Sequence, residues 1–367
     1  MKFDSNHRWV FSPADIKHEK ISGMHTEVGK EIIGYSRERF LLLTTFIAPG
    51  HCLLMANSGL GKTKTAEVLP LVVKGMNAGI IQGTPDKMPA SITGFNVVLQ
   101  DGTVKWYEGE MVSGPDGVNW LLIDESTRLT PRVWAALLQA MEGRKKTVEG
   151  QTYHMAPTFV VCLTANFPAP GEGTVELPNA VYDRILYNIQ WGYPDDDGYE
   201  ALIDRAQDLK LSDMDKEELR KKGLLNAKEH ANAVITMAEL NQMRWDVYAL
   251  AKSVTRETNP DMVRYIRRLV QAGLPFLAAS HPDHNPEVAQ WGATGGSPRF
   301  AMDLKMAAVS IAYGLDEKPG IEHVKAIYPE VAKAHMRLRD AAVQRRTPIR
   351  MDDVVNNILV KTDPFKG

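Results

Sequence analysis

Residues 56–63 have the sequence Ala-Asn-Ser-Gly-Leu-Gly-Lys-Thr. Their residue types and spacing are the most typical of a ligand-binding or catalytic site in the whole chain. An apolar run precedes them and a helical pattern follows, which is the strand–loop–helix context of a phosphate-binding loop. Backbone N–H groups in such a loop surround an anion at a helix N-terminus. Lys62 would reach the β- and γ-phosphates of a nucleotide, and the Thr63 hydroxyl would bind Mg²⁺.

One position departs from the usual pattern, because Ala56 stands where the first glycine is expected. Gly59 and Gly61 keep the backbone freedom that the loop needs. The alternative interpretation is a glycine-containing turn that binds nothing. The residues predicted to contact the nucleotide are Asn57, Ser58, Gly59, Leu60, Gly61, Lys62, Thr63 and Lys64.

A second pattern supports the first. Residues 118–125 form an apolar strand that ends in Asp124 and Glu125. Acids at the carboxyl end of a buried strand suit a nucleotide-binding sheet, since ligands lie beyond the strand ends there. Asp124 would share the Mg²⁺ with Thr63, and Glu125 would polarise the attacking water. A solvated strand end that carries acids by chance is the alternative.

Composition limits the class of protein. The 367 residues have room for about two domains, with 44% hydrophobic and 24% charged residues. The net charge of −2 means that the chain as a whole lacks the excess positive charge typical of nucleic-acid-binding proteins. Cys52 and Cys162 lie in expected buried strands and indicate core thiols of a reducing compartment. We find no signal-peptide pattern and no apolar run long enough to span a bilayer, so a cytoplasmic location is expected.

The expected organisation is an irregular N-terminal arm (1–30), an α/β nucleotide-binding core (31–193) and a mainly helical C-terminal domain (194–367). A helix is predicted for 31–47. The charge-rich run 204–230 is interpreted as a solvated helix face. A long loop between helices is expected around 275–296. The predicted strands, each short, apolar and bounded by turn residues or helices, are 52–55, 79–82, 120–124, 159–164 and 185–189.

Two β-hairpins are predicted as insertions in the core. One turns at Asp101-Gly102 and the other near Glu149-Gly150. Their strands hold Trp106, Tyr107 and Tyr153, side chains suited to gripping another protein. Ordinary edge structure is the alternative.

The order of these motifs resembles the AAA+ ATPases, and among them the MoxR group. The resemblance is close over residues 29–193 and looser over the C-terminal helices. It rests on the following segments beside the phosphate loop and the acidic strand: 50–54, 84–89, 92–94, Gly114-Pro115, 136–142, 164–166, Leu177-Pro178 and Asp183-Arg184. It implies a parallel-sheet core with hairpin insertions, a smaller helical lid domain, and the cofactors ATP and Mg²⁺.

The resemblance also implies roles for three residues outside the loop. Asn166 looks like the sensor that orients the attacking water, with a turn asparagine as the alternative. Arg184 looks like an arginine finger given to the neighbouring subunit, with a structural ion pair to Asp183 as the alternative. Arg299, at the start of a helix capped by Ser297, would point from the lid toward the phosphates as a second sensor, with a plain surface arginine as the alternative.

The leading hypothesis is therefore a ring-forming, Mg²⁺-dependent ATPase, expected to be a hexamer, that remodels or matures a partner protein. The resemblance implies a partner with a von Willebrand factor A domain. The second hypothesis is a motor subunit of a nucleic-acid-processing or defence complex, with Arg144, Lys145 and Lys146 as a basic hairpin tip. A nucleotide-binding scaffold without turnover is disfavoured because both Asp124 and Glu125 are present.

Overall fold

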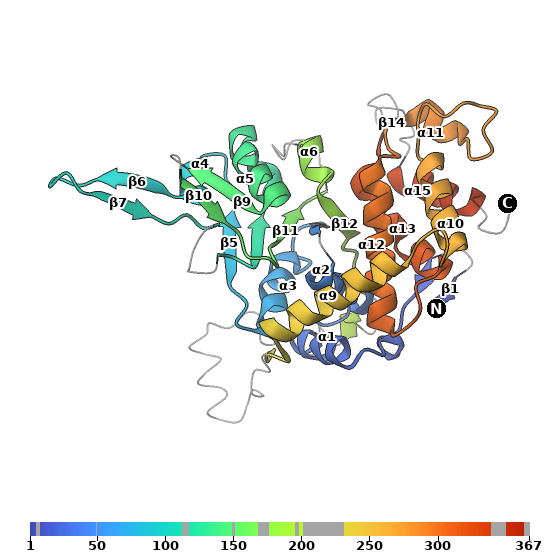
Figure 1. Cartoon of the computed structure of the whole chain (residues 1–367), viewed down its shortest axis with the longest axis horizontal. Helices are drawn as coiled ribbons and strands as arrows, with labels where there is room; N and C mark the ends of the chain where they lie inside the picture. The colour runs from blue at the N-terminus through green and yellow to red at the C-terminus, as the bar shows by residue number, and fades with distance from the viewer. Residues whose placement is uncertain are drawn as a thin grey trace.

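The structure is a computed structural model. It describes residues 1–4, 8–48, 50–111, 117–148, 151–167, 176–194, 198–200, 231–338 and 350–362. Its centre is a five-stranded sheet in the order β12–β3–β11–β8–β5, and every pairing in it is parallel (Figure 1). The strands are β3 (His51–Met55), β5 (Ala78–Gln82), β8 (Trp120–Asp124), β11 (Val160–Ala165) and β12 (Ile185–Gln190). All five predicted strands are confirmed.

Helices cover both faces of this sheet, which is why its inner strands are mostly apolar and almost entirely buried. Side chains alternate along β3, so Cys52 and Leu54 pack into one hydrophobic cluster and Leu53 into another. The first cluster includes most of α2 (Ser36–Ile47), and the second includes the apolar face of α5 (Pro131–Gly143). Cys52 pairs in register with Cys162, and both are free and buried, as expected for core thiols.

The N-terminal segment differs from the prediction. The expectation of an irregular arm is wrong for residues Glu19–Glu31, which form helix α1. Ile21, Met24 and Val28 are buried on one face of this helix, so it is part of the core. The predicted helix over 31–47 is also divided, because Gly34 and Tyr35 both have positive φ angles and α2 begins only at Ser36.

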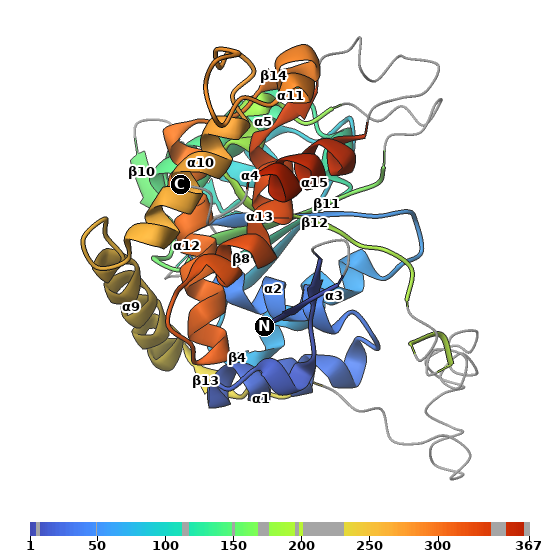
Figure 2. The ribbon, with the colours of Figure 1, turned by 90° about the vertical axis from the view of Figure 1, so that its right-hand side faces the viewer.

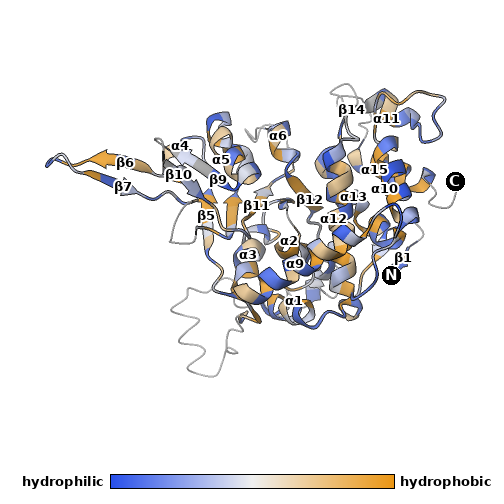
Figure 3. Ribbon diagram, viewed as in Figure 1, coloured by the Kyte–Doolittle hydropathy of each residue, from blue (hydrophilic) through white to orange (hydrophobic). Residues whose placement is uncertain are grey.

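Both predicted hairpins are present, and the first extends away from the body of the molecule (Figure 1). It pairs β6 (Phe95–Val98) with β7 (Val104–Tyr107), and Figure 3 shows β6 as mainly hydrophobic. Gly102, with φ +79°, allows the tight turn. The second hairpin pairs β9 (Lys145–Val148) with β10 (Gln151–His154), and its predicted turn at 149–150 lies outside the described residues.

The second hairpin corrects one sequence prediction. Arg144, Lys145 and Lys146 are not at a hairpin tip, because β9 starts at Lys145 and Arg144 ends the preceding helix. The Arg144 carbonyl accepts from the N–H of Met155 at the base of the hairpin, and its guanidinium donates to the Pro157 carbonyl (2.5 Å).

The C-terminal part is mainly helical, as predicted, and Figure 2 shows α10, α12, α13 and α15 gathered on one side of the sheet. Its helices are α9 (Met237–Ser253), α10 (Pro260–Ala272), α11 (Pro286–Trp291), α12 (Pro298–Leu315), α13 (Ile321–His335) and α15 (Met351–Lys361). Short α11 interrupts the loop expected around 275–296, and the charged run 204–230 lies outside the described residues. None of the helices in the described segments combines the length and the apolar character that crossing a membrane requires. The division into domains at residue 193 stays a prediction; β12 ends three positions earlier, at Gln190.

The remaining elements are short. They are β1 (Lys2–Phe3), β2 (Trp9–Val10), α3 (Lys62–Val68), β4 (Val73–Lys74), α4 (Pro89–Thr93), α6 (Asn179–Tyr182), β13 (Ile235–Thr236), β14 (Gly292–Thr294) and β15 (Arg337–Leu338), with 3₁₀ turns at Pro13–Asp15, Leu69–Val72 and Ser126–Arg128.

A buried arginine anchors α9 to the core. Arg244 is 7% exposed, and its two terminal nitrogens donate to the carbonyls of Phe46 (2.9 Å) and Pro157 (3.2 Å). Burial lowers the pKa of its guanidinium to about 10, which leaves it charged at neutral pH. These bonds join α9 to the end of α2 and to the segment before β11.

We predict that Arg244→Ala lowers the free energy of unfolding by about 1–3 kcal/mol, since the buried Phe46 carbonyl loses its charged donor while the Pro157 carbonyl keeps Arg144. Urea denaturation followed by circular dichroism measures the change. Exposed Arg256 provides the matched control, because Arg256→Ala should shift stability by less than about 0.5 kcal/mol. Equal stability of the two variants would contradict the anchoring role.

Candidate functional site

The loop after β3 has the backbone that its sequence predicts. Gly59 and Gly61 have φ angles of +82° and +79°, a region that strongly favours glycine. Ala56 is fully buried, its φ is not positive, and its N–H donates to the Ala165 carbonyl (3.1 Å). Alanine therefore suits a position where the usual pattern has glycine.

Lys62 turns back across the loop. Its ammonium group donates to the carbonyls of Ala56 (2.8 Å) and Asn57 (2.9 Å) and to Oδ1 of Asn166 (2.8 Å). Partial burial lowers the pKa of Lys62, while the charges of Asp124 and Glu125 act in the opposite direction. Asn166 follows directly after β11, so the predicted sensor and the predicted phosphate-binding lysine are in contact.

Thr63 and Asp124, the residues expected to bind the metal, are in contact. The Thr63 hydroxyl donates to Oδ1 of Asp124, with 2.9 Å between the oxygens. Mg²⁺ holds six oxygen ligands at about 2.0–2.1 Å in an octahedron, so neighbouring ligand oxygens lie about 3 Å apart. The two oxygens therefore have the chemistry and the separation of adjacent positions around Mg²⁺.

Thr164 is a residue of the candidate site whose part in it sequence reasoning missed. Its hydroxyl donates to Oδ1 of Asp124 and accepts from the backbone N–H of Glu125 (3.0 Å). It thus fixes both acids from the neighbouring strand. Its position directly before Ala165-Asn166, at the end of a strand, was the available signal.

Glu125 lines the same cavity but is held by its neighbours. Its φ is +49°, and its carboxylate pairs with Arg128 (2.9 Å) and accepts a longer bond from Gln82 (3.5 Å). The cavity has a volume of about 420 Å³. Its lining consists of Ser58 to Lys64, Asp124, Glu125, Thr164, Ala165 and Asn166.

The close approach of two strand ends beside this cavity requires glycine at position 83. The N–H of Gly83 donates to the Asp124 carbonyl (2.8 Å), and a Cβ at this position would collide with the carbonyl oxygens of Asp124 and Glu125. The end of β5 is thereby fixed against the end of β8.

Aromatic residues form a wall next to the loop that the sequence did not predict. The Trp191 indole N–H donates to the Leu60 carbonyl (2.9 Å), and Tyr35 stacks on the Trp191 ring with centroids 4.3 Å apart. The Tyr193 hydroxyl accepts a long bond from the Asn57 amide (3.4 Å). The clustering of Trp191 and Tyr193 just after the last strand was the signal for this wall.

Arg184 lies at the opposite edge of the sheet. It precedes β12, whose first residue, Ile185, pairs with His51 at the start of β3. The phosphate loop follows the far end of β3, about 13 Å along the strand. Arg184 donates to Glu142 (2.5 Å) and to the Ala180 carbonyl (2.6 Å), so the suggested ion pair with Asp183 is replaced by one with Glu142.

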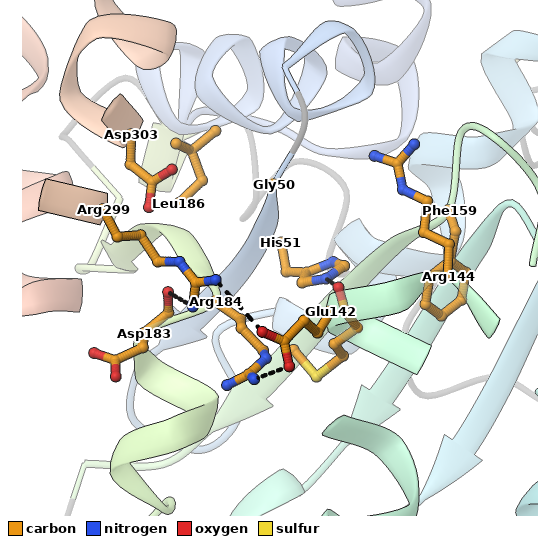
Figure 4. A pocket seen from close by; sticks show the side chains of 11 residues that line it. Gly50, His51, Glu142, Arg144, Phe159, Asp183, Arg184, Leu186, Arg299 and Asp303 are labelled. Carbon is orange, nitrogen blue, oxygen red and sulfur yellow. Dashed lines mark hydrogen bonds and ion pairs between the residues drawn. The ribbon is translucent and has the colours of Figure 1, made fainter. Parts of the chain in front are cut away.

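Arg299 does not point toward the phosphate loop of its own chain, which corrects the prediction. Ser297 caps α12 as expected, but Arg299 contacts the Asp183 carbonyl (3.4 Å) and the Glu142 carboxylate (3.8 Å) (Figure 4). The physical reason is the packing of α13 along β12, which brings the start of neighbouring α12 to the amino edge of the sheet. Arg184 and Arg299 therefore lie together.

Comparisons with known proteins agree with this arrangement. Residues 51–187 match the model of the ATPase family associated with various cellular activities. The chain is 36% identical over 167 residues to the uncharacterised protein YeaC of Bacillus subtilis and 29% identical over 335 residues to the chaperone MoxR1 of Mycobacterium tuberculosis. These alignments cover 46% and 91% of this chain, and 50% and 79% of the respective relatives.

A further relative and a solved structure complete the comparison. The protein MoxR of Methylorubrum extorquens is 29% identical over 192 residues, which are 52% of this chain and 54% of the relative. The crystal structure of a candidate ATPase from Cytophaga hutchinsonii superposes with a TM-score of 0.74 at 23% identity, covering 93% of this chain and 94% of that one. The chain thus spans about half the length of YeaC and of this MoxR protein, and the superposition confirms the fold. Residues 51–187 thus match the AAA+ ATPase family, and the chain is similar in sequence to proteins named MoxR.

Proposed function

We propose that this chain hydrolyses ATP with Mg²⁺ in a ring of identical subunits and uses the energy to remodel or mature a partner protein. The observation that carries the first part is the convergence of Lys62, the Thr63–Asp124 pair, Glu125 and Asn166 on one cavity. These groups come from three neighbouring strand ends.

Each of these residues has a distinct task in this proposal. The γ-phosphate of ATP takes the place of one of the three acceptors that Lys62 now contacts. Thr63 and Asp124 would hold Mg²⁺, which would supply positive charge beside the phosphates. Glu125 accepts the proton of the attacking water once its carboxylate turns away from Arg128, and Asn166 orients that water.

The position of the two arginines supports a requirement for a second copy. Arg184 and Arg299 lie at the amino edge of the sheet, while the phosphate loop lies at the carboxyl edge. Neither can reach the γ-phosphate of its own subunit without crossing the sheet. We therefore assign both to the nucleotide of a neighbouring subunit, where they stabilise charge in the transition state. A hexamer is our expected ring.

The hairpins are proposed to serve the partner, and the structure refines which side chains are available. Trp106 stacks on Tyr153 with ring centroids 4.8 Å apart, so these two aromatics join the hairpins to each other. Phe95, Val98, Val104 and Tyr107 are 40%, 70%, 62% and 40% exposed and belong to the accessible apolar surface of the first hairpin. A chaperone is named among the relatives, and a partner with a von Willebrand factor A domain remains our hypothesis from the family resemblance.

The nucleic-acid alternative has less support. Its basic hairpin tip is absent from the described residues, since Arg144 and Lys145 lie at the hairpin base. The net charge of −2 also gives the chain no overall positive charge that would attract the phosphates of nucleic acid. A cytoplasmic location also stays a prediction.

We predict that Glu125→Gln binds ATP normally but hydrolyses it at least ~10²-fold more slowly, the scale for loss of a positioned base. Lys62→Ala should instead abolish nucleotide binding, because the phosphates lose their charged donor. Fluorescent-nucleotide titration and phosphate release measure the two effects. Normal turnover by Glu125→Gln would refute the assignment.

We predict that a mixture of Arg184→Ala and Lys62→Ala subunits regains ATPase activity that neither variant has alone. In mixed rings, an intact phosphate loop on one subunit meets an intact arginine on its neighbour. Phosphate release across a series of mixing ratios measures the gain. The proposal fails if the wild-type protein keeps constant specific activity on dilution to a demonstrable monomer.

We predict that replacing Gln100–Thr103 with a short Gly-Ser turn leaves ATP affinity nearly unchanged, since this tip is far from the phosphate loop (Figure 1). The variant should lose partner-stimulated turnover or remodelling. A folded variant that no longer binds nucleotide would assign the hairpin to the active site instead.

A further inference from the structure

Glu142 is the point on which the two arginines converge. It lies at the end of α5, next to the last helical residue, Gly143. Its carboxylate accepts from Nη2 of Arg184 at 2.5 Å and lies 3.8 Å from Nη2 of Arg299. Figure 4 shows the two guanidinium groups approaching this carboxylate from different elements, one at the start of β12 and one at the start of α12.

The surroundings keep Arg184 withdrawn. Its side chain is only 15% exposed, because one terminal nitrogen donates to the Ala180 carbonyl and the other to Glu142. The side chain of Glu142, in contrast, is 58% exposed, so water or another anion has access to its contacts. The Arg184 guanidinium is therefore held in place, whereas the Glu142 carboxylate can be replaced by another anion.

A buried histidine holds the end of α5 in place. His51 contacts the Met141 carbonyl through Nε2 (3.1 Å) and accepts the N–H of Val161 at Nδ1 (3.0 Å). These partners assign the proton to Nε2. Burial lowers the pKa of His51 to about 4, so this neutral tautomer persists at physiological pH. Glu142 follows Met141 directly and is thus carried by a rigid frame.

We infer that Glu142 is a positioning residue that occupies, in the free subunit, the place taken by the neighbour's γ-phosphate in the ring. Both are anions that accept charge-assisted hydrogen bonds from guanidinium groups. The carboxylate keeps Arg184 and Arg299 side by side despite their like charges. When the ring assembles, the γ-phosphate bound to the neighbouring subunit replaces the Glu142 carboxylate as the anion that both arginines contact.

This inference rests on the proposed trans action of the arginines and adds a consequence to it. Assembly has to break the contacts of Glu142, so the carboxylate opposes ring formation around ATP. The cavity around these groups has a volume of about 170 Å³ and also contains Arg144, Asp183 and Asp303. Removing the charge of Glu142 leaves three arginines facing two acids, an environment more favourable for a phosphate.

The test is the protein concentration at which ATPase activity is half-maximal, measured with saturating ATP and Mg²⁺. Glu142→Gln keeps the shape and an acceptor oxygen but removes the charge, so it should lower this concentration about two- to fivefold, the scale of an exposed ion pair. Sedimentation velocity with ATP should show the same shift. A purely structural role for Glu142 predicts the opposite direction, because loss of a structural contact weakens assembly.

Glu322→Gln is the matched control. Glu322 is an exposed acid in an ion pair with Lys325 (3.6 Å) on α13, so the variant makes the same change of net charge elsewhere. It should leave the half-maximal concentration unchanged. The inference is overturned if the half-maximal concentration of Glu142→Gln equals or exceeds that of the wild type. If the wild type itself lacks concentration-dependent ATPase activity, the proposed function fails instead, which separates the two outcomes.

Discussion

The parallel pairing of the five central strands is the constraint on which the rest of the structure depends. It collects all carboxyl ends at one edge of the sheet and all amino ends at the other. Lys62, Asp124 and Asn166 follow carboxyl ends and meet in one cavity, whereas Arg184 precedes an amino end. In the ring that we propose, one chain would therefore carry two half-sites that face different neighbouring subunits.

The sequence predicted the carboxyl edge well because the relevant information is local. A phosphate loop, an acid pair and an asparagine each follow directly after an apolar run, and parallel strands bring such positions together without further specification. The positive φ angles of Gly59 and Gly61 agree with the prediction made from residue type alone, whereas the role of Asn166, which contacts Lys62, was implied only by the family resemblance. The two hairpins were equally local, since each depends on a short turn between alternating strands.

The amino edge was harder to predict because it depends on how distant helices pack. The location of Arg299 follows from the packing of α12 and α13 on β12, which no short motif encodes. Arg144 and Lys145 were assigned to a tip because their charge was visible in the sequence and the strand boundary was not. Helix α1 was missed although Ile21, Met24 and Val28 have helical spacing, because only three apolar residues mark its buried face and two glycines, Gly23 and Gly29, lower its helix propensity.

The Trp106–Tyr153 stack gives the two insertions a common mechanical behaviour. Trp106 also packs against Gly94, where a Cβ would collide with the indole, so the hairpin base is fixed on one side by backbone and on the other by a ring. The second hairpin connects α5 to β11, the strand that leads to Asn166. Because the second hairpin leads into β11, the stack connects the first hairpin to the strand that precedes Asn166, and the two insertions form one continuous packed unit.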